Sequence, residues 1–448
     1  MKKIIAMTIA AMMLLTAAGC GNSETSAAGG SDVSASDSTT DNTTSAPQAD
    51  VTSAPDADVE TSTSATEATS EPEVEEEIDY STLTEEEIYD MMVERSLITT
   101  GDETRMANVL DRASKGEEIT VAYIGGSITE GYHDNLTLAA DEKWSKMTNN
   151  WLAEQYPDAT FNYVNAGLSG TPSILGNLRL ERDVLASDPD IVFVEFAVND
   201  GNSTNYHNAY ESMVRTLLTQ DKDIAVVLLF TIVESGHTCQ DYMMKIGENY
   251  GLPMISLPNS LWVEIQEGRM TWDDYSGDQS HPHVEGSKYI RDYVIYYFEQ
   301  VMDGLTTGEV DKTLPEPVYS ADYMNMSFLE NTNFTPVLDG FVTHNTHHWF
   351  KNGWFYKGAD GAKMSFDITC KKLALIFLAN NSKVYGDAQI YVDGELFTTV
   401  SSNMESGWNN PEQTYIINEN ESAAHTVEIV VEGGTPCCFY VLGFGYCE

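Results

Sequence analysis

The chain has 448 residues, of which 70 are acidic and 23 basic, so that its formal net charge at pH 7 is −47. A surface this acidic repels nucleic acid and anionic lipid, and no Lys/Arg-rich run offers a site for phosphate. The composition therefore excludes a nucleic-acid partner and favours a neutral or weakly charged substrate. Once the export signal and tether described below are set aside, the remaining length suits two domains.

The first twenty residues have the composition of an export signal. Two lysines precede an apolar segment over residues 4–15, which is too short to span a membrane comfortably. Cys20 then follows small residues in a sequence that resembles a bacterial lipobox, and this resemblance implies cleavage before Cys20 and lipid attachment to its thiol. The alanine three positions earlier stands where Leu or Val is more usual, so plain secretion is the alternative. We expect a lipid-anchored protein on the extracellular side of the bacterial cytoplasmic membrane.

Residues 21–80 contain Ser, Thr, Ala, Asp and Glu and almost no large apolar side chain. Such a segment cannot bury enough apolar surface to offset the chain entropy that folding removes. Repulsion between its carboxylates favours an extended chain. We therefore predict a disordered acidic tether between the membrane and the folded part.

A strand followed by a sharp turn is predicted around Ser127. The apolar run 121–124 is typical of a buried strand, and two glycines directly before Ser127 allow a tight turn without a Cβ clash. Gly-Gly-Ser alone is most often an ordinary turn. Such a turn also presents a serine hydroxyl as a nucleophile, so further segments must decide between the two interpretations.

Three further segments follow along the chain. The first ends at Gly170 after a short strand, and the second is a continuously apolar strand with Asn199 at its carboxyl end. The third places Asp278 three residues before His281, just ahead of a segment with helical apolar spacing. Each has a structural alternative: a turn glycine, a helix cap at Asn199, and a solvated acidic loop or weak metal site around Asp278. The occurrence of all of them in one order favours a functional interpretation.

Ser127, Gly170, Asn199 and His281, with Asp278 before the histidine, resemble the sequence blocks of the SGNH branch of the GDSL esterase and lipase superfamily. The resemblance covers roughly residues 118–303. It implies an oxyanion hole made by the backbone amides of Ser127 and Gly170 and the side-chain amide of Asn199. It also implies catalysis without a metal or an organic cofactor.

The sequence departs from the family pattern at two positions. Gly126 stands where many members carry aspartate, and Ala197 stands where glycine is common. Neither position transfers a proton in the implied chemistry. The Gly-Gly-Ser variant indicates a subgroup of the superfamily that differs from a typical secreted lipase.

The catalytic chemistry explains why these residue types are needed. A serine hydroxyl becomes a good nucleophile when a neutral imidazole takes its proton, and His281 is the candidate base. Asp278 is the candidate carboxylate that fixes the imidazole tautomer and stabilises the imidazolium. His283 is a rival base, but it lacks a carboxylate at the same spacing.

The region around these residues alternates strand and helix patterns. Apolar strands are predicted near residues 121, 161 and 192, over 225–230 and over 253–257, and amphipathic segments over 141–156, 206–219 and 239–250. Such alternation is typical of a parallel sheet with helices on both faces, and the resemblance implies the flavodoxin-like form. We predict this domain over residues 81–310.

After about residue 311 the pattern changes to period-two alternation between turn residues, as at 364–370 and 427–431. We predict an all-β sandwich over residues 311–448. A hydrolase domain followed by such a domain is similar to several bacterial carbohydrate esterases that carry a jelly-roll or carbohydrate-binding module. Five cysteines besides Cys20 have no zinc-like spacing, and a pairing among the last four stays open.

Aromatic and histidine side chains cluster over 343–350, with Trp354 and Tyr356 close behind. They could form an aromatic platform for sugar, and His344, His347 and His348 could bind a metal. Packing of one sheet against the first domain is the interpretation we favour.

Taken together, the sequence predicts a serine esterase that removes small acyl groups, with acetyl expected, from a xylan- or mannan-type polysaccharide through an acyl-enzyme on Ser127. Another SGNH esterase is the first alternative: a peptidoglycan O-acetylesterase, a lysophospholipase or a thioesterase. A glycan-binding surface lipoprotein with a vestigial hydrolase domain is the second. The complete set of catalytic residue types argues against the vestigial domain.

Overall fold

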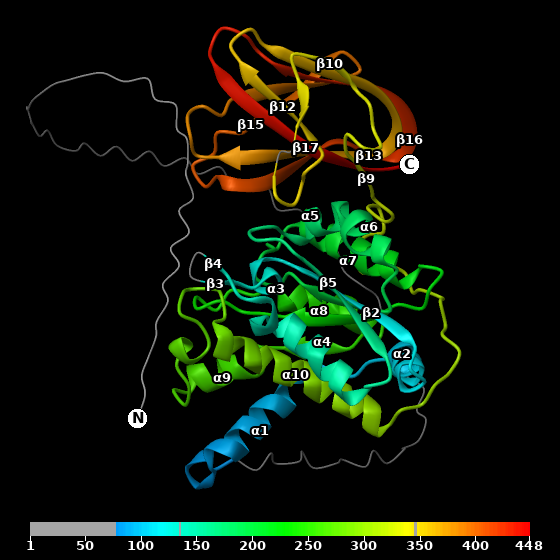
Figure 1. Cartoon of the computed structure of the whole chain (residues 1–448), viewed down its shortest axis with the longest axis vertical. Helices are drawn as coiled ribbons and strands as arrows, with labels where there is room; N and C mark the ends of the chain where they lie inside the picture. The colour runs from blue at the N-terminus through cyan, green and yellow to red at the C-terminus, as the bar shows by residue number, and fades with distance from the viewer. Residues whose placement is uncertain (1–77, 134–135, 345–346) are drawn as a thin grey trace, which may run out of the picture. The chain divides into compact units, whose positions relative to one another are not determined.

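The computed structural model describes residues 78–133, 136–344 and 347–448 (Figure 1). The predicted signal peptide, Cys20 and nearly all of the predicted tether lie outside the described residues. Residues 77–448 form one compact unit by their internal contacts. Among the described residues, no helix combines the length and apolar character needed to cross a membrane.

The first domain contains a six-stranded sheet in the order β1-β8-β7-β6-β2-β5. The strands are β1 (Leu97–Thr99), β2 (Glu118–Gly125), β5 (Thr160–Gly167), β6 (Ile191–Glu195), β7 (Ala225–Phe230) and β8 (Met254–Ser256). Numbered along the chain, the five parallel strands have the order 2-1-3-4-5, which is the flavodoxin-like order. The predicted fold class is therefore confirmed. The edge strand β1 is antiparallel to β8, so the sheet is mixed. This strand was not predicted, because three residues are too short for a recognisable strand pattern.

Helices cover both faces of this sheet (Figure 1). The core of one face includes residues of α1 (Glu85–Ser96), α2 (Thr104–Ser114), α4 (Trp144–Gln155), α9 (Leu261–Gln266) and α10 (Val284–Asp303). The other core includes residues of α6 (Leu180–Asp183), α7 (Thr204–Leu218) and α8 (Gln240–Asn249). The helices predicted over 141–156, 206–219 and 239–250 are confirmed as α4, α7 and α8. Strands β6 and β7 are buried on both faces, which explains their unbroken apolar sequences.

The second domain is an antiparallel nine-stranded sheet. Its strands are β9 (Ser327–Leu329), β10 (Val337–Asp339), β11 (Val342–His344), β12 (Gly353–Gly358), β13 (Ala362–Asn380), β14 (Asp387–Val392), β15 (Glu395–Ser401), β16 (Trp408–Val431) and β17 (Cys437–Cys447). Alternate residues such as Met364 and Phe366 face one apolar core. The predicted all-β domain is thus confirmed, while the boundary at residue 310 stays a prediction. Its four cysteines and Cys239 of the first domain, which are the cysteines that the structure describes, are free thiols.

A shared apolar cluster joins the two domains. Leu175 and Leu178 of α5 (Ser173–Leu178) pack in it with Ala374 and Ile376 of β13. The fit is close, because a Cβ added to Gly445 would lie 2.5 Å from Cδ2 of Leu178. The second domain is therefore packed firmly against the helix that follows the Gly170 turn.

The aromatic side chains predicted to cluster near residue 350 pack in two different places. Phe350 is fully buried in the shared cluster, as the packing interpretation predicted. Trp354 and Tyr356 are 1% and 5% exposed and belong to the core of the second domain. An aromatic sugar platform made by these two rings was therefore a wrong alternative, because their strand turns them inward.

Candidate active site

Ser127 lies at the point where β2 ends and the short helix α3 (Ser127–Glu130) begins. This point is the switch in strand order between β2 and β6, where open α/β sheets form their ligand sites. The backbone turns there in very little space. A Cβ added to Gly126 would lie 2.0 Å from Oδ1 of Asn199, so a side chain at this position would displace the Asn199 carboxamide. That contact is the structural reason for glycine before the serine in this chain.

The structure brings Ser127, His281 and Asp278 into one hydrogen-bonded chain. Oγ of Ser127 is 2.9 Å from Nε2 of His281, and Nδ1 of His281 is 2.9 Å from Oδ2 of Asp278. Ser127 is buried, whereas the His281 side chain is 20% exposed. With Asp278 accepting at Nδ1, the tautomer protonated at Nδ1 leaves Nε2 free to take the serine proton.

The loop that carries Asp278 and His281 is held by its own backbone. The N–H groups of Ser280 and His281 each donate to Oδ1 of Asp278 at 2.7 Å. Partial burial acts to raise the pKa of Asp278, but these bonds and the imidazole outweigh it, and the net effect lowers the pKa. Asp278 is therefore a carboxylate at neutral pH.

The three predicted oxyanion-hole residues lie in the segments that directly follow the adjacent strands β2, β5 and β6. Within the part of the chain that the structure describes, no hydrogen bond uses the backbone N–H of Ser127 or of Gly170. Gly170 has φ +68°, a left-handed conformation that favours glycine. Asn199 packs against Gly126, and it does not cap α7, whose N-cap is Ser203. The helix-cap alternative for Asn199 was therefore wrong.

Glu130 connects helix α3, which begins at Ser127, to the Gly170 turn, and sequence reasoning missed it. Its Oε2 accepts the backbone N–H of Ser169 at 2.7 Å and the Ser169 hydroxyl at 2.5 Å. Its Oε1 accepts the indole N–H of Trp349, which comes from the second domain, at 3.3 Å. One carboxylate thus fixes the residue before Gly170 and ties it to the second domain.

Glu195, at the end of β6, is a second residue that sequence reasoning missed. It is fully buried beneath the turn that carries Ser127, where it accepts from the hydroxyls of Thr129 (2.9 Å) and Thr231 (2.7 Å). The backbone amides of Gly126 and Thr129 also donate to it. Burial raises its pKa to about 7, although these hydrogen bonds act to lower it. The sequence signal that could have identified it is an acidic residue at the end of the apolar strand that leads to Asn199.

A hollow of about 160 Å³ lies beside the Ser127 site, and both domains line it. Tyr132, whose ring meets that of His281 edge-on at 4.8 Å, lines it from the first domain. Trp408 and His347 line it from the second. The Trp408 side chain is 55% exposed, and its Cζ2 would be 2.7 Å from a Cβ at Gly170. An exposed indole therefore rests on the predicted oxyanion turn.

The remaining alternatives for the histidines are settled by geometry. His283 caps α10, because its Nδ1 accepts the backbone N–H of Gly286 at 3.0 Å, so it is not placed as a second base. Burial, with a smaller effect of His348, lowers the pKa of His347 to about 4, so this ring is neutral at neutral pH. Across residues 78–133, 136–344 and 347–448, no group of three His, Cys, Asp or Glu side chains is arranged to hold a metal ion.

Comparison with known proteins agrees with this geometry. Residues 123–289 match the GDSL-like Lipase/Acylhydrolase family. An acetylxylan esterase of Geobacillus stearothermophilus is 26% identical over 161 residues, which cover 30% of this chain and 71% of that protein.

A two-domain esterase active on acetylated mannans is similar over both domains. Its crystal structure with mannopentaose has 26% sequence identity and a TM-score of 0.71, and the match covers 80% of this chain and 98% of that chain. Without mannopentaose the TM-score is 0.70. The first domain of this chain is therefore a GDSL-like lipase/acylhydrolase domain, and it is joined to an all-β domain.

Proposed function

We propose that this protein is a serine esterase that removes O-acetyl groups from a mannan- or xylan-type polysaccharide. The observation that carries the proposal is the hydrogen-bonded chain from Ser127 Oγ through His281 to Asp278, with both bonds at 2.9 Å. The family match and the similarity to an acetylxylan esterase and a mannan esterase support the same reaction class.

The reaction follows from the positions of the polar groups. Ser127 Oγ attacks the acetyl carbonyl carbon while Nε2 of His281 takes the hydroxyl proton. The amides of Ser127, Gly170 and Asn199 stabilise the negative charge that develops on the carbonyl oxygen. His281 then gives its proton to the departing sugar oxygen, which leaves an acetyl-enzyme on Ser127. A water molecule that loses a proton to His281 attacks this ester, and acetate leaves as Ser127 regains its proton.

The surroundings of the site support a sugar substrate. The exposed indole of Trp408 beside Gly170 offers the flat apolar face on which a sugar ring packs, while Ser169, His347 and His348 offer polar groups around it. The hollow is built from both domains, which agrees with a similarity to the mannan esterase that spans both.

The decisive measurement is acetate release by the full-length protein from acetylated glucomannan, acetylated xylan and O-acetylated peptidoglycan. We expect release from at least one of the two plant polymers and none from peptidoglycan. Lysophosphatidylcholine and an acyl-coenzyme A serve as controls for the other esterase classes. If p-nitrophenyl acetate is hydrolysed while neither plant polymer loses acetate, the polysaccharide assignment is wrong although the esterase assignment stands.

We also propose that the enzyme acts outside the cell, attached to the cytoplasmic membrane by lipid on Cys20. The support is the lysine pair, the short apolar segment and the small residues that precede this cysteine. Wild-type protein is expected in the membrane fraction and a Cys20→Ser variant in the soluble or secreted fraction. Equal membrane recovery of the two proteins would contradict lipid attachment at this residue.

A further inference from the structure

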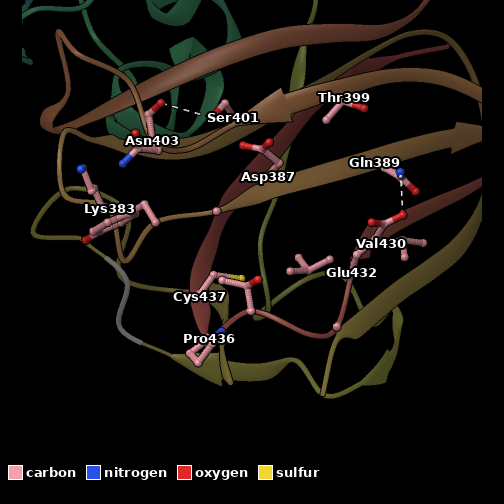
Figure 2. Close-up of a pocket in the computed structure, with 15 residues that line it drawn as sticks. Lys383, Asp387, Gln389, Thr399, Ser401, Asn403, Val430, Glu432, Pro436 and Cys437 are labelled. Atoms are coloured by element: carbon pink, nitrogen blue, oxygen red, sulfur yellow. Dashed lines mark hydrogen bonds between the residues drawn. The ribbon is translucent and has the colours of Figure 1, made fainter. Parts of the chain in front are cut away.

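The second domain carries a polar groove that the reaction at Ser127 does not use. It has a volume of about 600 Å³ and lies over the β14–β15 hairpin, where the loops 383–386 and 432–437 contribute to its walls (Figure 2). Of the residues that the structure describes, Lys383 is the one lysine or arginine that lines it. The groove therefore suits a neutral ligand rich in hydrogen-bonding groups.

The floor of the groove is a regular patch of polar side chains. Asp387 pairs with Ser401, and Gln389 pairs with Thr399, on neighbouring antiparallel strands. The alternate residue Ala388 is fully buried in the core, so these four side chains share the outer face of the hairpin. Amide, hydroxyl and carboxylate groups thus stand close together on one rigid surface.

Part of this surface is fixed and part is unpaired. Gln389 donates to Oε1 of Glu432 at 2.9 Å (Figure 2). It also accepts from the Tyr391 hydroxyl at 2.8 Å, so its orientation is set. The side chains of Asp387 and Thr399 make no hydrogen bond or ion pair with any described residue. The groove therefore combines held groups with free donors and acceptors at its floor.

Tyr385 links the groove to the hollow beside the active site. Its ring lines the groove, and its hydroxyl donates to Oδ1 of Asn409 at 3.4 Å. Asn409 has φ +74° and directly follows Trp408, the residue that rests on Gly170. The Asn380 side chain holds the same Oδ1 at 2.6 Å. Tyr385 of the groove therefore bonds to the residue next to Trp408, which lines the hollow.

We propose that this groove binds a deacetylated or unreacting stretch of the same polysaccharide chain whose acetyl group is hydrolysed at Ser127. This inference rests on the proposed function and extends it to a second binding region. Neutral sugar hydroxyls match the floor, because each both donates and accepts a hydrogen bond. Contacts in the groove, away from the reacting ester, hold the polymer on the enzyme. The hydrolysis of small esters, which do not reach the groove, is unaffected.

The test is the double variant Asp387→Ala/Thr399→Ala, made in the full-length chain. Neither side chain has a hydrogen bond to another described residue to lose, so the folded state should be retained. We expect kcat/KM on acetylated glucomannan, divided by kcat/KM on p-nitrophenyl acetate, to fall about fivefold, as the loss of two hydrogen bonds to neutral groups allows. Glu421→Ala removes one charge from an exposed position of β16 outside the groove and should leave this ratio at the wild-type value. An unchanged ratio in the double variant would overturn the proposal.

A binding measurement separates this inference from the esterase assignment. The inactive Ser127→Ala protein is run through native gels that contain glucomannan or xylan, with and without the two groove substitutions. Retardation that the substitutions abolish supports the groove even if no polymer is deacetylated. Equal retardation of both proteins, or no retardation of either by glucomannan or xylan, rejects it.

Discussion

Replacement of Ser127 by alanine is expected to lower kcat by about 10⁶ on p-nitrophenyl acetate and on the polymer, because the remaining groups can only stabilise attack by water. The hydroxyl lies 2.9 Å from Nε2 of His281 and has no substitute at that position. A serine-directed fluorophosphonate should label the wild-type protein once, on the peptide that contains Ser127. Kinetics and mass spectrometry of the labelled peptide together check the result.

Ser280→Ala provides a matched control for that variant. Ser280 lies beside His281, and its contribution to the site is the backbone N–H that Asp278 accepts at 2.7 Å, which alanine keeps. Its kcat should stay near the wild-type value. A Ser127→Ala enzyme that kept about a tenth of the wild-type kcat would remove Ser127 as nucleophile, since a lost covalent intermediate costs far more.

The meeting of the candidate site residues could be predicted because each of them follows a strong local pattern. Ser127, Gly170 and Asn199 each stand after an apolar strand, and parallel strands bring their carboxyl ends to one edge of the sheet. Asp278 and His281 are three residues apart in one loop, so their contact needs no knowledge of the fold.

The supporting residues could not be predicted in the same way, because their partners are distant in sequence. Glu130 meets Trp349 across 219 residues, and Trp408 reaches Gly170 only through the packing of the second domain. The short edge strand β1 was also missed, because its pairing with β8 depends on tertiary contact rather than on periodicity. The sequence left open a sugar platform made by Trp354 and Tyr356, because composition alone does not tell which face of a strand is buried.

The second large effect is expected from Glu195→Gln, which should lower kcat about 100-fold with little change in KM, because a small displacement of the nucleophile turn is costly. Four donors converge on this carboxylate: two hydroxyls and the backbone amides of Gly126 and Thr129. An ionised carboxylate accepts all four, whereas the amide of glutamine presents two N–H groups that face donors. Ser127 lies between the two backbone positions that this group holds.

Glu195 also gives the wild-type protein a dependence of stability on pH that the Glu195→Gln variant lacks. Burial raises its folded pKa to about 7 from an ordinary value of 4.5, so the folded protein binds more protons than the unfolded chain between these two values. The resulting stabilisation is present below about pH 4.5 and is lost as the pH rises to about 7. Chemical denaturation should therefore find a larger difference in unfolding free energy between wild type and Glu195→Gln at pH 5 than at pH 8. The fall of kcat as the pH is lowered should be less steep in the variant, because the variant lacks this ionisation.

Glu211→Gln distinguishes positioning of the nucleophile from a general loss of stability. Glu211 is also fully buried and accepts the backbone N–H groups of Val318, Tyr319 and Ser320, but it lies on α7 and touches no group of the site. We expect it to lower the unfolding free energy while kcat is unchanged. If the two variants lost stability equally and both kept wild-type kcat, Glu195 would be a structural residue. A kcat loss confined to Glu195→Gln would show that this carboxylate positions Ser127, because it accepts from the backbone on both sides of the serine.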